Sequence, residues 1–287
     1  MVIKGTLIPI GGNEDRGADK PEHLNLEFIG EGILARVLKE AGGKDSKIVI
    51  IPTASSIPVE MGSGYIEAFN KLGCQSTHVL DIRTREDALE EHCCTLVNDA
   101  DCVLFTGGNQ SHITNKIGGT PLHSLLSKRY VKENFVIAGT SAGAMCMSHE
   151  MITGGSAKES FLKGAVGMNR GMSFIPGLII DSHFIRRGRF GRLAEAVSRF
   201  PHLLGIGLAE DTGLVIKKGK VMEVIGSGMV IVFDPRKLSF NNQQSLELGE
   251  PMTITNLSTH VLASGDRFNL NKRKIAVLPA GIDTSYY

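Results

Sequence analysis

Short apolar runs alternate with helix-compatible segments through the first half of the chain. Four runs rich in β-branched residues have the length of strands, at residues 47–51, 78–82, 101–105 and 135–138. They are apolar at successive positions, so both faces of each strand are expected to be covered. The alternation predicts an α/β fold, a mostly parallel sheet with helices on both faces.

Helix signals lie between these strands. Residues 26–39 place apolar side chains on one face at helical spacing, and the glycine pair at 42–43 is typical of a helix C-terminus. The run from Thr84 to Asp87 has the form of a capping box in front of Ala88. That pattern predicts the start of a helix at this point.

The pattern changes beyond residue 205. Residues 214–225 contain two strand-like runs on either side of a turn at Gly219, and shorter runs follow at 229–233 and 260–262. This arrangement predicts an antiparallel meander, a β-rich C-terminal part that forms an appendage or an edge of the same domain.

Nothing in the sequence divides the chain into separate units. There is no low-complexity linker and no repeat of fixed period, so we predict a single α/β domain over residues 1–287. Residues 154–176 are rich in Gly, Met, Ser and Lys and have no clear period. We interpret them as a loop over a site.

Composition and charge exclude several classes of function. The 287 residues carry 31 Lys and Arg against 30 Asp and Glu, a net charge of +1, so we expect no nucleic-acid partner and no membrane partner. The apolar runs are much shorter than the roughly 20 residues that span a bilayer. The N-terminus has neither a hydrophobic signal region nor a cleavage site, which predicts a cytoplasmic protein.

Cofactor and metal motifs are also missing from the sequence. It holds no G-x-G-x-x-G after a strand, no P-loop and no H-E-x-x-H, so we expect no cofactor and no metal ion. Its 5 cysteines are odd in number and lack the spacing of a metal knuckle. They are predicted to be reduced and mostly buried thiols.

The strongest chemical signal is a G-x-S-x-G sequence at residues 139–143, between the apolar run 135–138 and a helix-compatible segment. In this context it predicts a nucleophile elbow, a strained turn that holds Ser141 above the sheet while the glycines avoid steric clashes. The helix N-terminus and the amide of Ala142 would then face an oxyanion. The alternative is a glycine-rich turn with a capping serine.

A nucleophilic serine needs a base and an acid that orients the base. His183 follows one apolar strand and Glu210 ends the next, and the carboxyl ends of parallel strands meet at one edge of a sheet. The alternative follows the α/β-hydrolase order and combines His260 with Asp211 or Asp234. We favour the first pair because the second histidine falls in the predicted meander.

Two further segments indicate contacts with a substrate. Four arginines lie within residues 186–192, where a helix N-terminus would disfavour them, so at least one is expected to bind a substrate carboxylate. The amide of Gly108 would complete an oxyanion hole with Ala142, and Gln110 offers hydrogen bonds to substrate. The alternative is that the glycines only form a tight turn and Asn109 caps the next helix.

Taken in order, these motifs resemble a family of serine peptidases that includes the cyanophycinases and dipeptidase E and has the fold of class I glutamine amidotransferases. The resemblance rests on residues 10–14, 105–110, 139–144, 181–184 and 208–213. Glu210 and the arginine-rich run to Arg192 fit the cyanophycinase branch. Ser182 and Arg186 depart from the larger, uncharged polar residues expected there.

The resemblance implies a hydrolase of cyanophycin, multi-L-arginyl-poly-L-aspartate, that releases β-Asp-Arg dipeptides from a chain end and forms a homodimer. It implies an acyl-enzyme mechanism in which Ser141 is the nucleophile, His183 the base and Glu210 the orienting acid. The residues that it assigns to substrate binding are Gln110, Asp181, Arg187, Arg189 and Arg192. Two other functions stay open: an aspartyl dipeptidase acting on short soluble Asp-X peptides, and a non-catalytic binding protein of the same fold.

Overall fold

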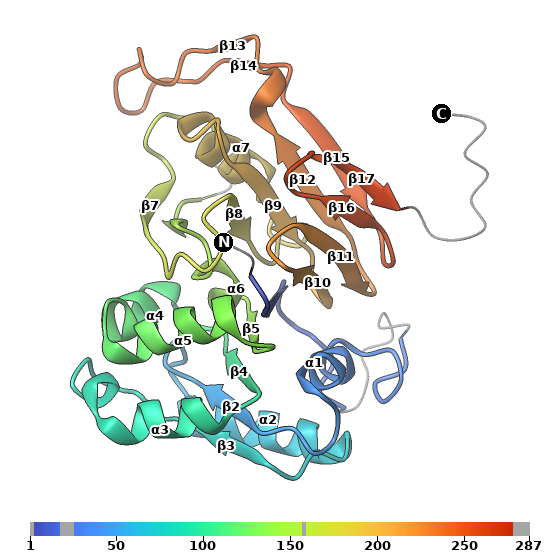
Figure 1. The fold of residues 1–287 in the computed structure, drawn as a ribbon. Coiled ribbons are helices and arrows are strands. Elements are labelled where there is room, and N and C mark those ends of the chain that lie inside the picture. The colour runs from blue at the N-terminus through green and yellow to red at the C-terminus, as the bar shows by residue number, and fades with distance from the viewer. Residues whose placement is uncertain (1–2, 18–25, 157–158, 278–287) are drawn as a thin grey trace.

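The computed structural model describes residues 3–17, 26–156 and 159–277, and within them the largest element is a sheet of nine strands (Figure 1). Its parallel half contains, in spatial order, β1 (Thr6–Ile10), β5 (Val136–Thr140), β4 (Cys102–Phe105), β2 (Ile48–Ile51) and β3 (Thr77–Val79). On the other side of β1 follow the antiparallel strands β10 (Thr212–Lys217), β11 (Val221–Gly226), β16 (Arg267–Asn269) and β17 (Lys274–Val277). The sheet therefore changes from parallel to antiparallel at β1.

A second sheet packs against the antiparallel half through a shared apolar core. Its strands are, in order, β15 (Ser258–Leu262), β12 (Val230–Asp234), β9 (Leu204–Leu208) and β8 (Leu178–Asp181). Of these, β8 and β9 run parallel and the others antiparallel. Two short ribbons complete the strands, β6 (Glu150–Gly154) with β7 (Gly167–Arg170), and β13 (Phe240–Asn241) with β14 (Ile254–Thr255).

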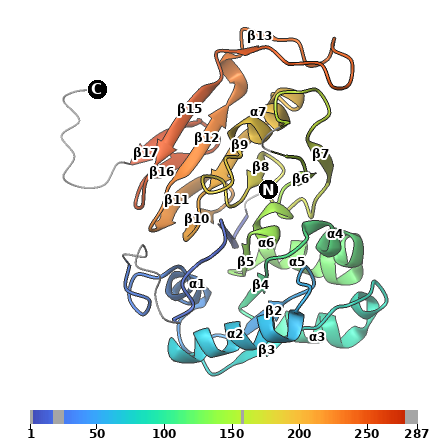
Figure 2. The ribbon, with the colours of Figure 1, turned by 180° about the vertical axis from the view of Figure 1, so that it is seen from behind.

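Helices cover both faces of the parallel half of the main sheet (Figure 2). The described helices are α1 (Ile33–Ala41), α2 (Pro58–Lys71), α3 (Glu91–Asp99), α4 (Gln110–Ile117), α5 (Pro121–Lys132), α6 (Ala142–Met145) and α7 (Phe190–Arg199), with single 3-10 turns η1 (Asp87–Leu89) and η2 (Pro235–Lys237). α1 and α2 pack on Ile48 and Ile50, whereas α3, α4 and α5 share a core with Val49 and Ile51. Alternate residues of β2 thus face two cores, as its continuous apolar run predicts.

The α/β class and the predicted strands are confirmed. The four predicted runs form β2, β3, β4 and β5, and the turn at Gly219 joins β10 to β11. The meander prediction was too simple, because β10 and β11 extend the main sheet whereas β12 and β15 join the second one. The predicted loop at residues 154–176 contains β7, paired with β6.

The predicted helix over residues 26–39 is wrong in its first half. α1 begins only at Ile33, and Ile29 is 66% exposed instead of lying on the apolar face. The amides of Glu31 and Gly32 both donate to the carbonyl of Glu27, so a separate turn precedes the helix. The predicted end is correct, since the amide of Gly42 caps the last turn.

The capping box before residue 88 is confirmed, although the helix that it starts is the short turn η1. Thr84 Oγ1 accepts a hydrogen bond from the Asp87 amide at 3.2 Å, and Asp87 Oδ2 accepts one from the Thr84 amide at 2.8 Å. All five cysteines are free, as expected. Among the described residues, no helix has the length and apolar character needed to cross a membrane.

The packing of α6 against the sheet requires glycine at two positions. A Cβ atom on Gly143 would lie 2.2 Å from the carbonyl oxygen of Phe105 in β4, and one on Gly139 would lie 2.4 Å from the carbonyl oxygen of Gly143. These distances are far below van der Waals contact, and the neighbouring atoms belong to the backbone. The two glycines of the G-x-S-x-G sequence therefore set how closely α6 approaches β4 and β5.

We expect Gly143→Ala to destabilise the fold by about 1–3 kcal/mol through overpacking. Gly177→Ala is the matched control, because a Cβ there has nothing within 4 Å. Chemical denaturation of both variants measures the difference. Equal stability of the two variants would contradict the close packing of α6.

Candidate active site

Ser141 lies at a strained turn between β5 and α6. It has φ 51° and ψ −107°, outside the regions that residues with a side chain normally occupy. Such a conformation costs about 1–3 kcal/mol and persists only where the surroundings enforce it. Here the Ser141 amide donates to the carbonyl of Ile10 at 2.8 Å. The turn is thus held from the neighbouring strand β1.

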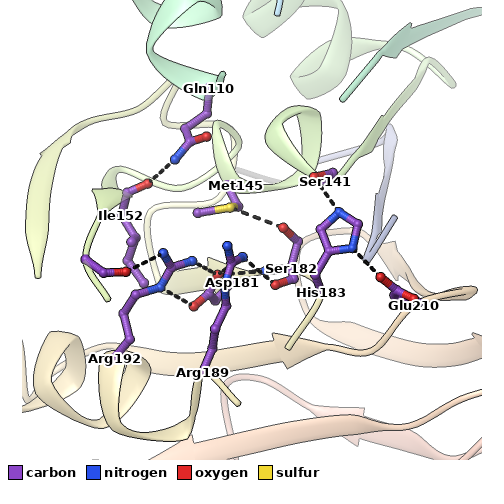
Figure 3. Close-up of polar contacts among 11 residues, drawn as sticks. Gln110, Ser141, Met145, Ile152, Asp181, Ser182, His183, Arg189, Arg192 and Glu210 are labelled. Carbon is purple, nitrogen blue, oxygen red and sulfur yellow. Dashed lines mark hydrogen bonds and ion pairs between the residues drawn. The ribbon is translucent and has the colours of Figure 1, made fainter. Parts of the chain in front are cut away.

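The side chains of Ser141, His183 and Glu210 form one hydrogen-bonded chain (Figure 3). His183 Nε2 lies 3.0 Å from Ser141 Oγ, and His183 Nδ1 lies 2.7 Å from Glu210 Oε1. His183 and Glu210 follow the adjacent parallel strands β8 and β9 of the second sheet, whereas Ser141 follows β5 of the main sheet. The two sheets therefore face each other across this site.

The alternative base from the sequence does not reach this arrangement. His260 lies in β15, where its ring packs at 5.6 Å from that of Phe268. Asp234 forms ion pairs with Arg236 and Arg273. The ring that contacts Ser141 Oγ belongs to His183.

The backbone at the end of β1 forms hydrogen bonds with the three segments that contain Ser141, His183 and Glu210. Besides Ile10, the carbonyl of Gly11 accepts from the His183 amide at 2.9 Å, and the carbonyl of Gly12 accepts from the Asp211 amide at 2.8 Å. A Cβ on Gly12 would lie 2.5 Å from Cε1 of His183, so the imidazole ring stacks directly on this glycine. Sequence reasoning assigned no role to the segment; a glycine pair directly after a strand was its visible signal.

The pKa values of the pair favour a neutral histidine and an ionised glutamate. Burial lowers the pKa of His183, and the charges of Arg187 and Arg189 lower it further, which outweighs the opposing hydrogen bond to Glu210. Burial raises the pKa of Glu210, but hydrogen bonds from His183, Asn13 and Arg186 outweigh burial and lower it overall. A neutral imidazole beside a hydroxyl can accept its proton, while the carboxylate stabilises the resulting cation.

Arg186 is a contact of the glutamate that the sequence did not indicate. Its Nη1 lies 3.1 Å from Glu210 Oε2, although the arginine side chain is 71% exposed. One carboxylate oxygen of Glu210 therefore forms a hydrogen bond with the imidazole of His183, and the other accepts one from the guanidinium of Arg186. Both contacts favour the charged carboxylate.

Gly108 and Ala142 are close neighbours of Ser141. Both Gly108 and Ser141 line two adjoining cavities, and a Cβ on Gly107 would be only 3.5 Å from Ser141 Cβ. Within the described residues, neither the Gly108 amide nor the Ala142 amide has a hydrogen-bond acceptor. The role of these amides as an oxyanion hole stays a prediction.

One of these cavities, about 340 Å³ in volume, is lined by Gln110, Arg187, Arg189 and Arg192, together with Gly154 and Gly155 from the predicted loop. Gln110 donates through Nε2 to the carbonyl of Ile152 at 2.7 Å. Burial lowers the pKa of Arg189 to about 10, so its guanidinium stays charged at neutral pH. We refer to this space as the arginine cavity.

Asp181 forms hydrogen bonds with two of the arginines that line the arginine cavity (Figure 3). It is fully buried, with 0% of its surface exposed. Its Oδ2 accepts from Arg192 Nε at 2.8 Å and its Oδ1 accepts from Arg189 Nη1 at 3.1 Å. Its carboxylate neutralises two guanidinium groups and has no exposed surface. In this position Asp181 holds the two arginines in place and does not line the cavity.

No group of three or more His, Cys, Asp or Glu side chains in the described ranges has the arrangement of a metal site.

Comparison with known proteins finds a peptidase family and sequence relatives named cyanophycinase. The model of peptidase family S51 matches residues 29–224. A cyanophycinase of Trichormus variabilis is 36% identical over 280 residues, covering 98% of this chain and 90% of its own. A cyanophycinase of Geminocystis herdmanii is 36% identical over 267 residues, covering 93% of this chain and 94% of its own.

A solved structure shares the fold. The crystal structure of a peptidase from an acI-B1 Actinobacterium superposes with a TM-score of 0.65 at 21% identity, covering 93% of this chain and 97% of that one. The family match spans more than half of the chain, and the two sequence relatives span nearly all of it. This chain therefore belongs to peptidase family S51 and is a serine-type peptidase.

Proposed function

We propose that this peptidase hydrolyses cyanophycin, multi-L-arginyl-poly-L-aspartate, with Ser141 as the nucleophile. The observation that carries the proposal is the hydrogen-bonded chain of Ser141, His183 and Glu210, with its distances of 3.0 Å and 2.7 Å. Support for the substrate comes from relatives named cyanophycinase that align over 93% or more of this chain.

In the proposed reaction His183 Nε2 takes the hydroxyl proton as Ser141 Oγ attacks the carbonyl carbon of a peptide bond. The amides of Gly108 and Ala142 bind the oxyanion, and Glu210 stabilises the imidazolium. His183 then gives the proton to the leaving amine as the C–N bond breaks. A water molecule, deprotonated by the same imidazole, then attacks the ester carbonyl. The imidazolium returns the proton to Ser141 Oγ as the acyl C–O bond breaks, which releases the acyl group as a carboxylic acid.

The products follow from the polymer's chemistry. Each aspartate of its main chain carries an arginine on its side-chain carboxyl, so release of β-Asp-Arg requires cleavage of the main-chain amide between aspartates. In our proposal the arginine cavity binds a carboxylate near the end of the polymer, through Arg187 and Arg189 with Gln110. Asp181 then acts indirectly, by holding the arginines. The single domain, the homodimer and the cytoplasmic location stay predictions.

Ser141→Ala is expected to lower the cleavage rate by several orders of magnitude, because both the nucleophile and the acyl-enzyme are lost. Clearance of a cyanophycin suspension measures the rate, and mass spectrometry of the supernatant identifies the products. Ser63→Ala, on the exposed side of α2, is the control that should behave like the wild type.

The outcome separates the candidate functions. β-Asp-Arg released by the wild-type protein alone supports the proposal. Cleavage of short Asp-X peptides without clearance of the polymer would support an aspartyl dipeptidase. If neither substrate is cleaved and no fluorophosphonate reacts with Ser141, the proposal of a serine nucleophile is wrong.

The charge of Arg187 sets part of the pH dependence of the site. Removing the charge of Arg187 should raise the pKa of His183, since that charge now disfavours the imidazolium. In Arg187→Gln the base would then become protonated at a higher pH. When the rate of fluorophosphonate labelling is plotted against pH, the acidic limb of the profile should therefore move to higher pH. Lys128→Gln, an exposed change on α5, should leave the limb in place. An acidic limb that moves to lower pH would contradict the assigned electrostatics.

A further inference from the structure

A second cavity adjoins Ser141 and takes no part in the proposal so far. It has a volume of about 350 Å³, and it shares Gly108, Ser141 and Arg187 with the arginine cavity. Its remaining wall includes Glu14, Arg16, Met61 and Tyr65. We refer to this space as the glutamate cavity. Because the two cavities meet at the serine, a substrate held at the serine has room to extend into both.

The distinctive group of this cavity is the carboxylate of Glu14, only 6% exposed. It accepts hydrogen bonds from Thr140 Oγ1 at 2.6 Å and from the hydroxyl of Tyr65. Both donors are neutral, and no described Lys, Arg or His side chain forms an ion pair with Glu14. Burial and the charge of Glu14 raise the pKa of Tyr65 well above its usual value, so this hydroxyl stays a donor.

The wall beside this carboxylate already holds one guanidinium. The guanidinium carbon of Arg16 lies 5.4 Å from the centre of the Tyr65 ring, and its Nη1 contacts Met61 Sδ at 3.5 Å. An aromatic face and a polarisable sulfur are favourable surroundings for a planar cation. Arg16 is exposed, so a ligand can displace it without loss of buried packing.

We propose that the glutamate cavity is a subsite for a guanidinium group of the substrate, with Glu14 as its counter-charge and Tyr65 as its aromatic wall. This inference rests on the proposed function, since the polymer carries an arginyl group on each aspartate. The arginine cavity then recognises an anion on one side of the serine, and the glutamate cavity recognises a cation on the other. A substrate with both charges is thereby aligned across the nucleophile.

The test compares two ligands that differ in one charge. The ligands are a two-unit fragment of β-Asp-Arg and its counterpart in which one arginine is replaced by citrulline, the neutral analogue of arginine. Both are bound to Ser141→Ala protein in titration calorimetry. We expect the arginyl fragment to bind roughly 10- to 100-fold more tightly, the range for a hydrogen bond to a charged group. Adding Glu14→Gln should remove most of this preference, whereas adding Glu67→Gln, an exposed change on α2, should preserve it.

A second variant keeps the test independent of any folding defect in Glu14→Gln. Arg16→Ala lies on the surface, and it vacates the Tyr65 face and removes a like charge. Affinity for the arginyl fragment should rise several-fold, while affinity for the citrulline fragment stays the same. A fall in arginyl affinity, or equal affinity of the two fragments for the parent protein, would overturn the guanidinium subsite.

The two proposals fail in different ways. If the polymer is not cleaved but the preference for arginine depends on Glu14, the proposed function is wrong and the subsite stands. If the polymer is cleaved and Glu14→Gln keeps the full preference, the subsite is wrong and the proposed function stands.

Discussion

Three consecutive carbonyl groups at the end of β1 position the site. Those of Ile10, Gly11 and Gly12 accept the amides of Ser141, His183 and Asp211, at 2.8, 2.9 and 2.8 Å. These amides lie in three segments that follow strands of two different sheets. β1 is also the strand at which the main sheet changes from parallel to antiparallel pairing. The serine, the histidine and the glutamate can therefore meet only if this backbone keeps its path.

The same contacts account for the strain in the site. Ser141, His183 and Asp211 all have positive φ, with values of 51°, 47° and 46°. Each is unfavourable alone and is compensated by the hydrogen bond that its amide makes to the β1 end. Gly12 adds a steric condition, since its missing Cβ leaves room for the imidazole of His183. Of the two cavities that meet at the nucleophile, one is lined by Arg189 and Arg192 and the other by the buried carboxylate of Glu14.

Sequence patterns predicted those parts of the fold in which the type and spacing of the residues follow directly from burial or from chemistry. Runs apolar at successive positions identified β2, β4 and β5, and the predicted partners His183 and Glu210 do lie beside Ser141. The late start of α1 was missed because an apolar spacing does not reveal the turn that backbone hydrogen bonds form before it. The second sheet and the carbonyls of β1 were missed for a similar reason, since backbone pairing leaves little trace in residue type. The burial of Asp181 depends on long-range packing that no local pattern contains.

The most direct test of this account is the rate at which a fluorophosphonate labels Ser141 in Gly12→Ala. Gly43→Ala is the matched control, because Gly43 has φ 98° against 103° for Gly12, but a Cβ there meets nothing within 4 Å. Both variants carry similar backbone strain, and only the first pushes on the imidazole. The account predicts that Gly12→Ala folds and loses labelling by at least about tenfold, while Gly43→Ala labels normally. Labelling of folded Gly12→Ala at the wild-type rate would contradict it.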